Sequence, residues 1–576
     1  MKKILIIAIL LISAGATAFY FQQQSKQSTY NVLDYVPADS PIFSAQLQPF
    51  PIKDYLKSSA GLQLLKQTQF AYNIDGSEPQ DLFFQYLLQS YQVSILDADI
   101  MTTTFGLADD IRGYFYTLGL LPVLKIEVAK PEAIWKLLDS AEKQSGFSHR
   151  LGKIGEQEYR AYRLNDLDQE YDIEMVFAQN NGLLTITLTS SRNFNALLIN
   201  ALGLKKVDNP LSQSGIIEKI RTKYGFSEQN ISYLNHQEIV KGLTTTDQNQ
   251  LAQQLSLFLE VVDKPSLLND IRTPECAADF AAIAENWPRS VFGYKSMNIT
   301  NSQSTLEMSG IIESNNSVFI EALKSIRGDI AQYTQEHQNN VFSLALALDM
   351  NKINSAMSNI LNDLKKPNYQ CQPLQEMQAS IQQQGHSSLA MLSMATGMAN
   401  GVQGIAFALV DYAISTANKK PTLDNLDLVI SYSADNPFTL FNAAKALSPE
   451  LAEVELLDSG EGFDLKKLFP FPLPKDIKLA PKAAIKGQHL VIYNGEKGQE
   501  LASQLSSQAL QKNGLFEVAF DFQKLLTPII ALAELTGEQL PAEVGLLKSL
   551  NMDMQFSFDV NEHGLIFDSY DQNRSN

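Results

Sequence analysis

The chain has 576 residues, of which 45% are hydrophobic and 19% are charged. This composition is typical of a folded protein, and the length exceeds what one hydrophobic core usually supports, so we expect two or more domains. The 45 Lys and Arg residues and 63 Asp and Glu residues leave a net charge of −18. An acidic surface repels phosphate backbones and anionic lipid headgroups, which argues against nucleic acid as a partner.

The N-terminus has the pattern of a bacterial export signal. Lys2 and Lys3 precede an uncharged apolar run over residues 4–21, which ends at three glutamines. We favour an uncleaved transmembrane anchor, which would leave the rest of the chain in the periplasm of a Gram-negative bacterium. The alternative is a signal peptide that is cleaved near Ala18, where Ala16 and Ala18 form a small-residue site. Residues 1–24 are assigned to this signal or anchor.

In chain order, the first half starts with a Pro- and Asp-containing turn at residues 36–41 and continues with alternating strands and helices. The strands expected here are residues 42–47, 123–128 and 183–188, followed by a hairpin over residues 295–312. A helix is expected after Pro51, another from Pro131 to about residue 143, and a third over residues 253–262. Strands that alternate apolar with polar residues favour an antiparallel sheet.

Cys276 and Cys371 are the two cysteines of the chain. In an oxidising compartment they favour one disulfide, and two buried free thiols are the alternative. Both lie in Pro-containing, loop-like contexts. One cysteine falls in each half of the chain, so the bond is expected to staple the halves together.

The second half repeats the pattern of the first. Its expected strands are residues 341–346, 428–432 and 488–493 with a hairpin over residues 548–567, and its expected helices are residues 318–327, 353–364, 438–447 and 525–535. We therefore predict an α+β fold of two tandem homologous modules, each mainly an antiparallel sheet covered by helices. Their expected bounds are residues 30–314 and 315–576.

A glycine motif present in both halves supports this duplication. Residues 105–113, FGLADDIRG, return as residues 396–404, TGMANGVQG. We expect the glycines to permit tight turns or close packing of helix on sheet. Asp109 aligns with Asn400, and an amide would not replace a catalytic carboxylate, so we expect a turn or capping role at both positions.

Motifs for catalysis or metal binding are weak. Residues 140–143 match S-x-x-K, but they end an amphipathic helix and no K-T-G follows. His386, Met391, Met394 and Met398 have the side chains for Cu(I), although these methionines are more typical of core filling. The alternating acids of residues 166–174 lack the glycine of a calcium loop and favour the wet face of a strand. No catalytic, cofactor or metal residue is assigned.

A Pro- and Phe-rich stretch in the second half, LFPFPLP over residues 468–474, is extended and cannot join a central strand. Phe469, Phe471 and Leu473 are therefore candidate contacts for a partner. The alternative is a loop that covers the sheet of the second module.

The export signal, the Val36-Pro37-Ala38-Asp39 opening and the repeated strand-then-helix units resemble a family of N-terminally anchored bacterial envelope proteins with domains of unknown function. The resemblance implies no activity. We expect a non-catalytic binding or scaffolding protein of the cell envelope, without a cofactor, whose partners are the inner membrane and another envelope protein. The alternative is an envelope hydrolase or a copper-handling protein with an unrecognised site.

Overall fold

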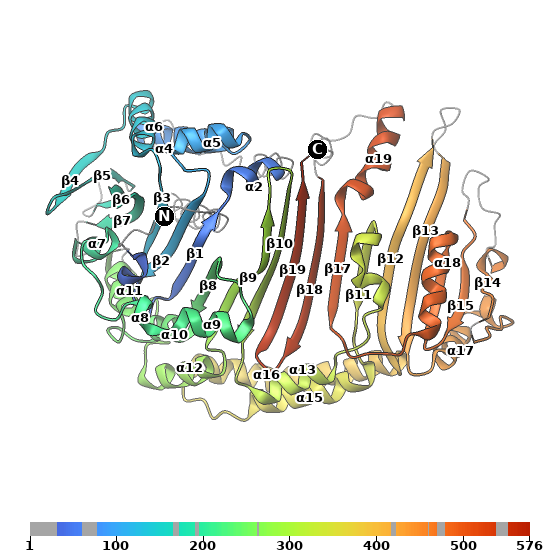
Figure 1. The fold of residues 1–576 in the computed structure, drawn as a ribbon. Coiled ribbons are helices and arrows are strands. Elements are labelled where there is room, and N and C mark those ends of the chain that lie inside the picture. The colour runs from blue at the N-terminus through green and yellow to red at the C-terminus, as the bar shows by residue number, and fades with distance from the viewer. Residues whose placement is uncertain are drawn as a thin grey trace. The chain divides into compact units, whose positions relative to one another are not determined.

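The computed structural model describes residues 31–59, 76, 78–164, 172–190, 195–261, 264–415, 422–458, 460–468, 479–536 and 551–575. The chain divides into two compact units. Figure 1 labels the helices and strands of both units. Unit 1 extends to Glu313 and also includes Tyr369–Pro373, whereas unit 2 comprises Ser314–Asn368 and Leu374–Arg574. The expected anchor, residues 4–21, lies outside the described residues. Among the residues that are described, no helix has the length and apolarity needed to cross a membrane.

The strands of unit 1 form an antiparallel sheet in the order β4-β5-β6-β7-β3-β2-β1-β8-β9-β10. Their bounds are β1 Ile42–Phe50, β2 Ile111–Leu118, β3 Leu121–Glu127, β4 Arg150–Ile154, β5 Gln157–Arg163, β6 Ile173–Asn180, β7 Leu183–Ser190, β8 Asn230–Asn235, β9 Arg289–Ile299 and β10 Gln303–Glu313. The helices are α2 Ile52–Ser58, α4 Pro79–Ser94, α5 Ala98–Phe105, α6 Pro131–Ser145, α7 Asn195–Ala201, α8 Leu211–Ser214, α9 Ile216–Tyr224, α10 His236–Thr244, α11 Gln250–Val261 and α12 Pro274–Asn286.

Helices α4 and α6 form one core of unit 1 with strands β5, β6 and β7 of this sheet. In α6, Pro131 takes the first helical position and Gly146 ends the helix in the left-handed conformation. Ile134, Leu138 and Ala141 lie on one side of the helix and are buried. Phe83 of α4 stacks on Tyr162 of β5 with ring centroids 4.5 Å apart.

The strands of unit 2 also pair in antiparallel fashion, in the order β14-β15-β16-β13-β12-β11-β17-β18-β19. Their bounds are β11 Phe342–Leu346, β12 Val402–Ser415, β13 Thr422–Ala434, β14 Phe463–Asp464, β15 Lys482–Lys486, β16 His489–Asn494, β17 Phe516–Asp521, β18 Met552–Asn561 and β19 Gly564–Arg574. The helices are α13 Ser317–Ser325, α14 Gln332–Gln335, α15 Met350–Lys365, α16 Gln372–Met398, α17 Pro437–Leu447, α18 Gly495–Gln504 and α19 Phe522–Thr536.

The α+β class and the antiparallel sheets agree with the sequence-based prediction, and three local expectations are wrong. Cys276 lies in the first turn of α12 instead of a loop, because Thr273 caps the helix and Pro274 begins it. Glu174 is buried instead of facing water, and Arg150 Nε donates a hydrogen bond to its carboxylate at 2.9 Å.

The third wrong expectation concerns the methionines of α16. Met391 and Met394 were expected to fill the core, yet they are 65% and 73% exposed. This helix has alanines and serines between its methionines, and it packs through other residues, such as Leu392, against α13 and α15. The apolar run of the sequence therefore does not mark a buried helix.

Candidate functional site

The central sheet of unit 2, formed by β13, β12, β11, β17 and β18, has two faces of different character. Along β11, β17 and parts of β12 and β13, buried residues alternate with half-buried or exposed ones. In β11, Ser343 and Ala345 are buried, and Leu344 and Leu346 are exposed. Successive side chains of a strand point to opposite faces. One face of the sheet is therefore covered and the other is open.

The covered face has small side chains. Ala345, Ala406, Ala408 and Ser431 are buried there, and Tyr333 lies among them with its hydroxyl 2.8 Å from Ser431 Oγ. Helix α18 covers the same face through Ala502. Small residues let a covering helix and a tyrosine ring approach the strands closely.

The open face, by contrast, has large apolar side chains in three cross-strand rows. The rows are Leu428-Leu409-Phe342-Phe520-Met554, Ile430-Phe407-Leu344-Val518-Phe556 and Tyr432-Ile405-Leu346-Phe516-Phe558. Leu344, Leu346, Ile405 and Phe556 are 38%, 44%, 39% and 39% exposed, and the others are half-buried. We call these residues the open face. A contiguous apolar surface of this kind marks a contact site more often than scattered apolar residues do.

Aromatic contacts and helices define the limits of the open face. Phe558 packs against the core that includes α13 and α15, and Ile492, the β16 partner of Ile430, packs against the core around Phe441 of α17. The rings of Phe342 and Phe407 lie 5.9 Å apart, and those of Phe516 and Phe556 lie 6.4 Å apart. Helix α19 lies at one end, where it contacts β12, β17 and β18, and its Phe522 ring is 4.8 Å from that of Phe520. The side chains are thus held by their neighbours, so the surface is preorganised.

The corresponding strands of unit 1 are buried on both faces. Phe43 of β1, Tyr116 of β2, Val123 of β3 and Tyr233 of β8 form the cross-strand row that matches Phe342 by its position in the strand order. All of these side chains are at most 2% exposed. Within the described part of unit 1, the row that matches the Phe342 row is therefore buried, whereas the Phe342 row of unit 2 is half-buried.

A serine, a histidine and an aspartate meet in the interior of unit 2. Ser433 Oγ donates a hydrogen bond to Asp329 Oδ2 at 2.7 Å and lies 3.1 Å from His489 Nδ1. All three side chains are buried. Because the serine proton points to Asp329, the contact with His489 requires a proton on Nδ1, and that nitrogen cannot act as a base toward Ser433. A nucleophilic triad needs the histidine between serine and carboxylate, so this cluster is structural.

The cluster ties together segments that are distant in the sequence. The Asp329 Oδ1 atom accepts a hydrogen bond from the Gln511 backbone N–H at 2.8 Å, and the Asp329 N–H donates to the Gln403 carbonyl at 3.0 Å. Burial lowers the pKa of His489, which favours the neutral imidazole in the folded state. Sequence motifs missed this cluster because its members are far apart along the chain.

Unit 1 contains a fully buried lysine. Lys125 of β3 is 1% exposed, and its Nζ donates a hydrogen bond to Thr185 Oγ1 at 2.9 Å. Burial lowers the pKa of Lys125 to about 7. An amine that is partly neutral at physiological pH has the reactivity of a catalytic base or nucleophile. Its burial leaves no route for a substrate, so we assign it no catalytic role.

Two carboxylates of unit 2 are also perturbed, but they do not form a pair. Burial raises the pKa of Asp571 to about 6 and raises the pKa of Glu517. Asp571 is paired with Met554 in the β18–β19 register and therefore lies at the margin of the open face. Glu517 is paired with Ala345 and lies on the covered face. Two acids on opposite faces of a sheet cannot share a substrate.

The structure brings no metal-binding group together within its described part. Of the acids at residues 166–174, Asp172 forms an ion pair with Arg163 at 2.7 Å and Glu174 pairs with Arg150. The copper candidates Met391 and Met394 lie exposed on α16, and the side chains of His386 and Met398 lie outside what the structure describes. Asp109 forms an exposed ion pair with Lys53 at 3.3 Å.

A small cavity lies in unit 1 beside the start of β1. Pro37, Ser40, Thr117, Gly119 and Leu251 are among its lining residues, and its volume is about 10 Å³. That volume is about the space of one water molecule. The cavity is too small for an organic substrate.

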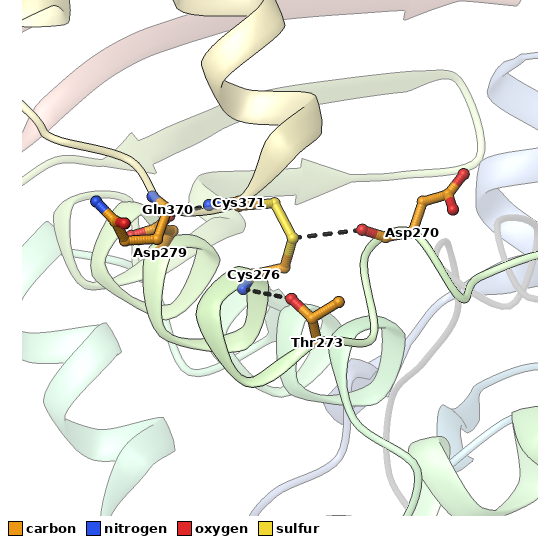
Figure 2. Close-up of a disulfide and its surroundings, with 6 residues drawn as sticks. All are labelled: Asp270, Thr273, Cys276, Asp279, Gln370 and Cys371. Carbon is orange, nitrogen blue, oxygen red and sulfur yellow. Dashed lines mark hydrogen bonds between the residues drawn. A yellow bond between two sulfur atoms is a disulfide. The ribbon is translucent and has the colours of Figure 1, made fainter.

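Cys276 and Cys371 form the expected disulfide, which is buried (Figure 2). Cys371 belongs to the segment Tyr369–Pro373, which is counted with unit 1 although unit 2 flanks it in the sequence. The Asp279 carboxylate of α12 accepts hydrogen bonds from the backbone N–H groups of Gln370 and Cys371 at 2.7 and 2.8 Å. The disulfide and one carboxylate therefore fix this segment to α12.

The three predicted partner contacts, Phe469, Phe471 and Leu473, lie outside the described residues. The open face was not identified from the sequence, although it has a signal there. In β11, β12 and β17, large apolar residues alternate with Ala, Ser or Glu. This alternation predicts large residues in the core and small ones in water, whereas unit 2 has the reverse arrangement.

The comparisons with known proteins give little further information. No protein-family model matches the chain, and no curated protein matches it. A solved structure entitled "Structure of crystal form III of TP0453" is similar at 11% sequence identity, over 52% of this chain and 89% of that chain, with a TM-score of 0.23. A likeness at this level carries no argument about fold or function.

Proposed function

We propose that this chain is a non-catalytic binding or scaffolding protein of the bacterial periplasm, tethered to the inner membrane by residues 4–21. Its partner surface is the open face of unit 2. The export pattern of residues 1–24 supports the location, and the buried disulfide is consistent with an oxidising compartment. The alternative location is a soluble periplasmic form, cleaved near Ala18.

We also propose that the two units are homologous modules. The strand order β5-β6-β7-β3-β2-β1-β8-β9-β10 of unit 1 corresponds, strand for strand and in chain order, to the order β14-β15-β16-β13-β12-β11-β17-β18-β19 of unit 2. Strand β4 is the additional member of unit 1. A shared strand order of this length supports a duplication. After the duplication, unit 2 would have retained one uncovered face of its sheet.

The open face is the observation that carries the binding function. Side chains such as Leu344 and Phe556 are large, apolar and in contact with water, whereas the residues on the covered face are small. Burial of apolar surface stabilises a complex by roughly 25 cal/mol per Å². A folded chain that exposes its largest side chains in a continuous sheet therefore favours association with an apolar surface.

The alternative, an envelope hydrolase, has weaker support. Ser433 lies beside a histidine, but its proton is directed to Asp329. Ser290 Oγ lies 3.1 Å from His236 Nε2, but the Nδ1 of that histidine contacts the Trp287 carbonyl oxygen, at 2.8 Å, instead of a carboxylate. The buried position of Ser433 also separates it from any substrate. The copper-handling alternative depends on Met391 and Met394, two exposed thioethers on one helix.

Site-specific photocrosslinking in intact cells tests the binding function. The full chain would have p-benzoylphenylalanine at position 344 on the open face or, as a matched control, at Gln499, an exposed residue of α18 on the opposite side. We expect a discrete protein adduct from position 344, identified by mass spectrometry, and no such adduct from position 499. The absence of any adduct from position 344 would refute the binding function of the open face.

Fractionation tests the tether. The full chain is expected to remain with the inner membrane after extraction at high pH and to become soluble when residues 1–24 are replaced by a cleavable signal peptide. Release of the unaltered chain with the soluble periplasm would instead support cleavage near Ala18.

A further inference from the structure

We infer that the open face of unit 2 binds the open face of a second copy of this chain, so that two sheets pack face to face in a homodimer. The inference rests on the proposed function, because it specifies the partner of the same surface. It is supported by the extent of the three rows on β13, β12, β11, β17 and β18, and by their almost entirely apolar composition.

The area of the open face suits a dimer. Neighbouring strands lie about 4.8 Å apart and alternate residues about 7 Å apart, so three rows on five strands cover on the order of 20 by 25 Å. On β19 the face continues to Phe567, whereas on β16 the paired residues Leu490 and Ile492 pack against the core around Phe441 of α17, so the face ends there. Three rows of this size, on the order of 500 Å², would form the apolar centre of a standard interface, which buries roughly 800 Å² per partner. Their extent lies within the range of about 300–600 Å² of the largest apolar patches on typical monomers, which are often functional.

The chemistry of the face matches its own copy. A two-fold axis brings the same patch of both chains together, so three apolar rows meet three apolar rows, and Asp571, the β19 partner of Met554, lies at their margin. In the rows that contain Leu344 and Phe342, no side chain has a hydrogen-bonding atom, and Tyr432, in the third row, is the polar exception. Two sheets pack about 10 Å apart when their facing side chains interdigitate, and Phe and Leu have the length to fill that space. Burial of the face would leave few polar groups unsatisfied.

Other occupants fit less well. A lipid or small ligand on this sheet would be in contact with protein on one side only. Ligand sites are usually concave and bury most of the ligand surface, so this face is a poor ligand site. Insertion of the face into a bilayer would bring a chain with a net charge of −18 against anionic headgroups. A second copy needs neither concavity nor basic charge. An unrelated protein with an apolar face is the remaining competitor, and the experiment below distinguishes it.

The charge of the chain gives the dimer a characteristic salt dependence. Each copy has a net charge of −18, so two copies repel each other at low ionic strength. Salt screens this repulsion over about 10 Å at 0.1 M and strengthens apolar association. Dimer formation is therefore expected to increase with salt, opposite to an interface held by ion pairs.

The test uses two differently tagged full-length copies, expressed together at low level, with p-benzoylphenylalanine at position 344 of one copy. We expect an adduct that contains both tags and only peptides of this chain, with a yield that rises between 50 and 500 mM salt in opened cells. In Phe407→Ser/Phe556→Ser the yield should fall by at least about tenfold, because two central aromatic anchors are lost. Leu457→Ser, which changes a 73% exposed leucine outside the open face, should leave the yield unchanged.

The possible outcomes separate the two proposals. An adduct with a different protein, or with lipid, overturns the homodimer, and a different protein leaves the proposed binding function in place. No adduct at position 344 overturns both. Persistence of the self-adduct in the double variant also overturns the homodimer. Retention of the Cys276–Cys371 disulfide and of protease resistance in each variant shows that a loss of yield does not come from unfolding.

Discussion

Ser433 and Asp329 are joined by a buried hydrogen bond in which the serine hydroxyl donates to Oδ2 at 2.7 Å. His489 lies on the other side of the same hydroxyl, at 3.1 Å. The direction of the serine proton decides the role of the trio, because a nucleophilic serine must donate to a histidine. The trio therefore stabilises the interior of unit 2.

The first prediction concerns this bond. Ser433→Ala should lower the free energy of unfolding by about 1–2 kcal/mol, because Asp329 loses one of its buried donors. Asp329→Ala should cost more, since the Gln511 N–H and the Ser433 hydroxyl both lose their acceptor. Urea denaturation measures both effects. Ser503→Ala, an exposed serine of α18, serves as the control, and equal stability of Ser433→Ala and wild type would contradict the assignment.

The second prediction concerns Lys125. Its pKa is about 7 in the folded state and near its usual 10.5 in the unfolded state. Between these values the unfolded state binds more protons, so stability should rise with pH from 7 to 10.5, and the penalty should be complete below pH 7. Lys125→Met should raise the free energy of unfolding at pH 6 by on the order of a few kcal/mol and by much less at pH 10.

Urea denaturation at pH 6, 8 and 10 measures this difference. The exposed Lys130→Met is the control, and its effect should stay within about 0.5 kcal/mol at each pH. If Lys125→Met destabilises the protein equally at all three pH values, the Thr185 hydrogen bond outweighs the cost of burying the amine and the prediction is wrong.

The third prediction compares the two glycines that begin the repeated motif. Gly106 ends α5 with φ of 66°, and a Cβ there would overlap the Lys130 carbonyl oxygen. Gly397 lies within α16, where nothing lies within 4 Å of a Cβ. Gly106→Ala should lower the free energy of unfolding by at least about 2 kcal/mol, through strain and overlap. Gly397→Ala should raise it by up to about 1 kcal/mol, through helix propensity. Thermal unfolding measures both effects. Changes in stability of opposite sign would support a left-handed turn at Gly106 and a helix at Gly397, whereas equal changes would contradict this difference.

The fourth prediction concerns the disulfide, whose cysteines are 95 residues apart. Cys276→Ser/Cys371→Ser should lower the free energy of unfolding by on the order of 4 kcal/mol, because the unfolded chain regains the entropy of an open loop. Reduction of the wild type before denaturation should give the same loss. A double variant as stable as the oxidised wild type would show that Asp279 and the packing around α12 suffice.

The sequence predicted much of the fold and little of the candidate site. Period-two patterns located strands such as β3 and β13, and Pro131 marked the start of α6, because these signals are local. Gly106 and Gly404 proved to be sites of a left-handed turn and of close packing, as the motif predicted, but Gly397 did not.

The remaining features depend on the tertiary structure. The pattern of Leu344 and Ala345 predicts alternation but not which face a helix covers, and hydrophobicity favours the wrong face. Ser433, His489 and Asp329 meet only after the three segments that contain them have packed. The helical position of Cys276 has a local signal, because Thr273 is a typical N-cap residue and Pro274 is typical of the first helical position.

The reversed faces of the unit 2 sheet also affect how the chain behaves before it binds a partner. Strands β11, β12, β13, β17 and β18 expose large apolar side chains to solvent. Each collision between two unbound chains can therefore produce a non-specific apolar contact. The excess of negative charge keeps chains dispersed during this interval. The negative charge therefore favours dispersed chains, whereas the apolar open face favours association. A variant with neutralised acids should precipitate sooner than one with a polar open face, although both would have the same fold.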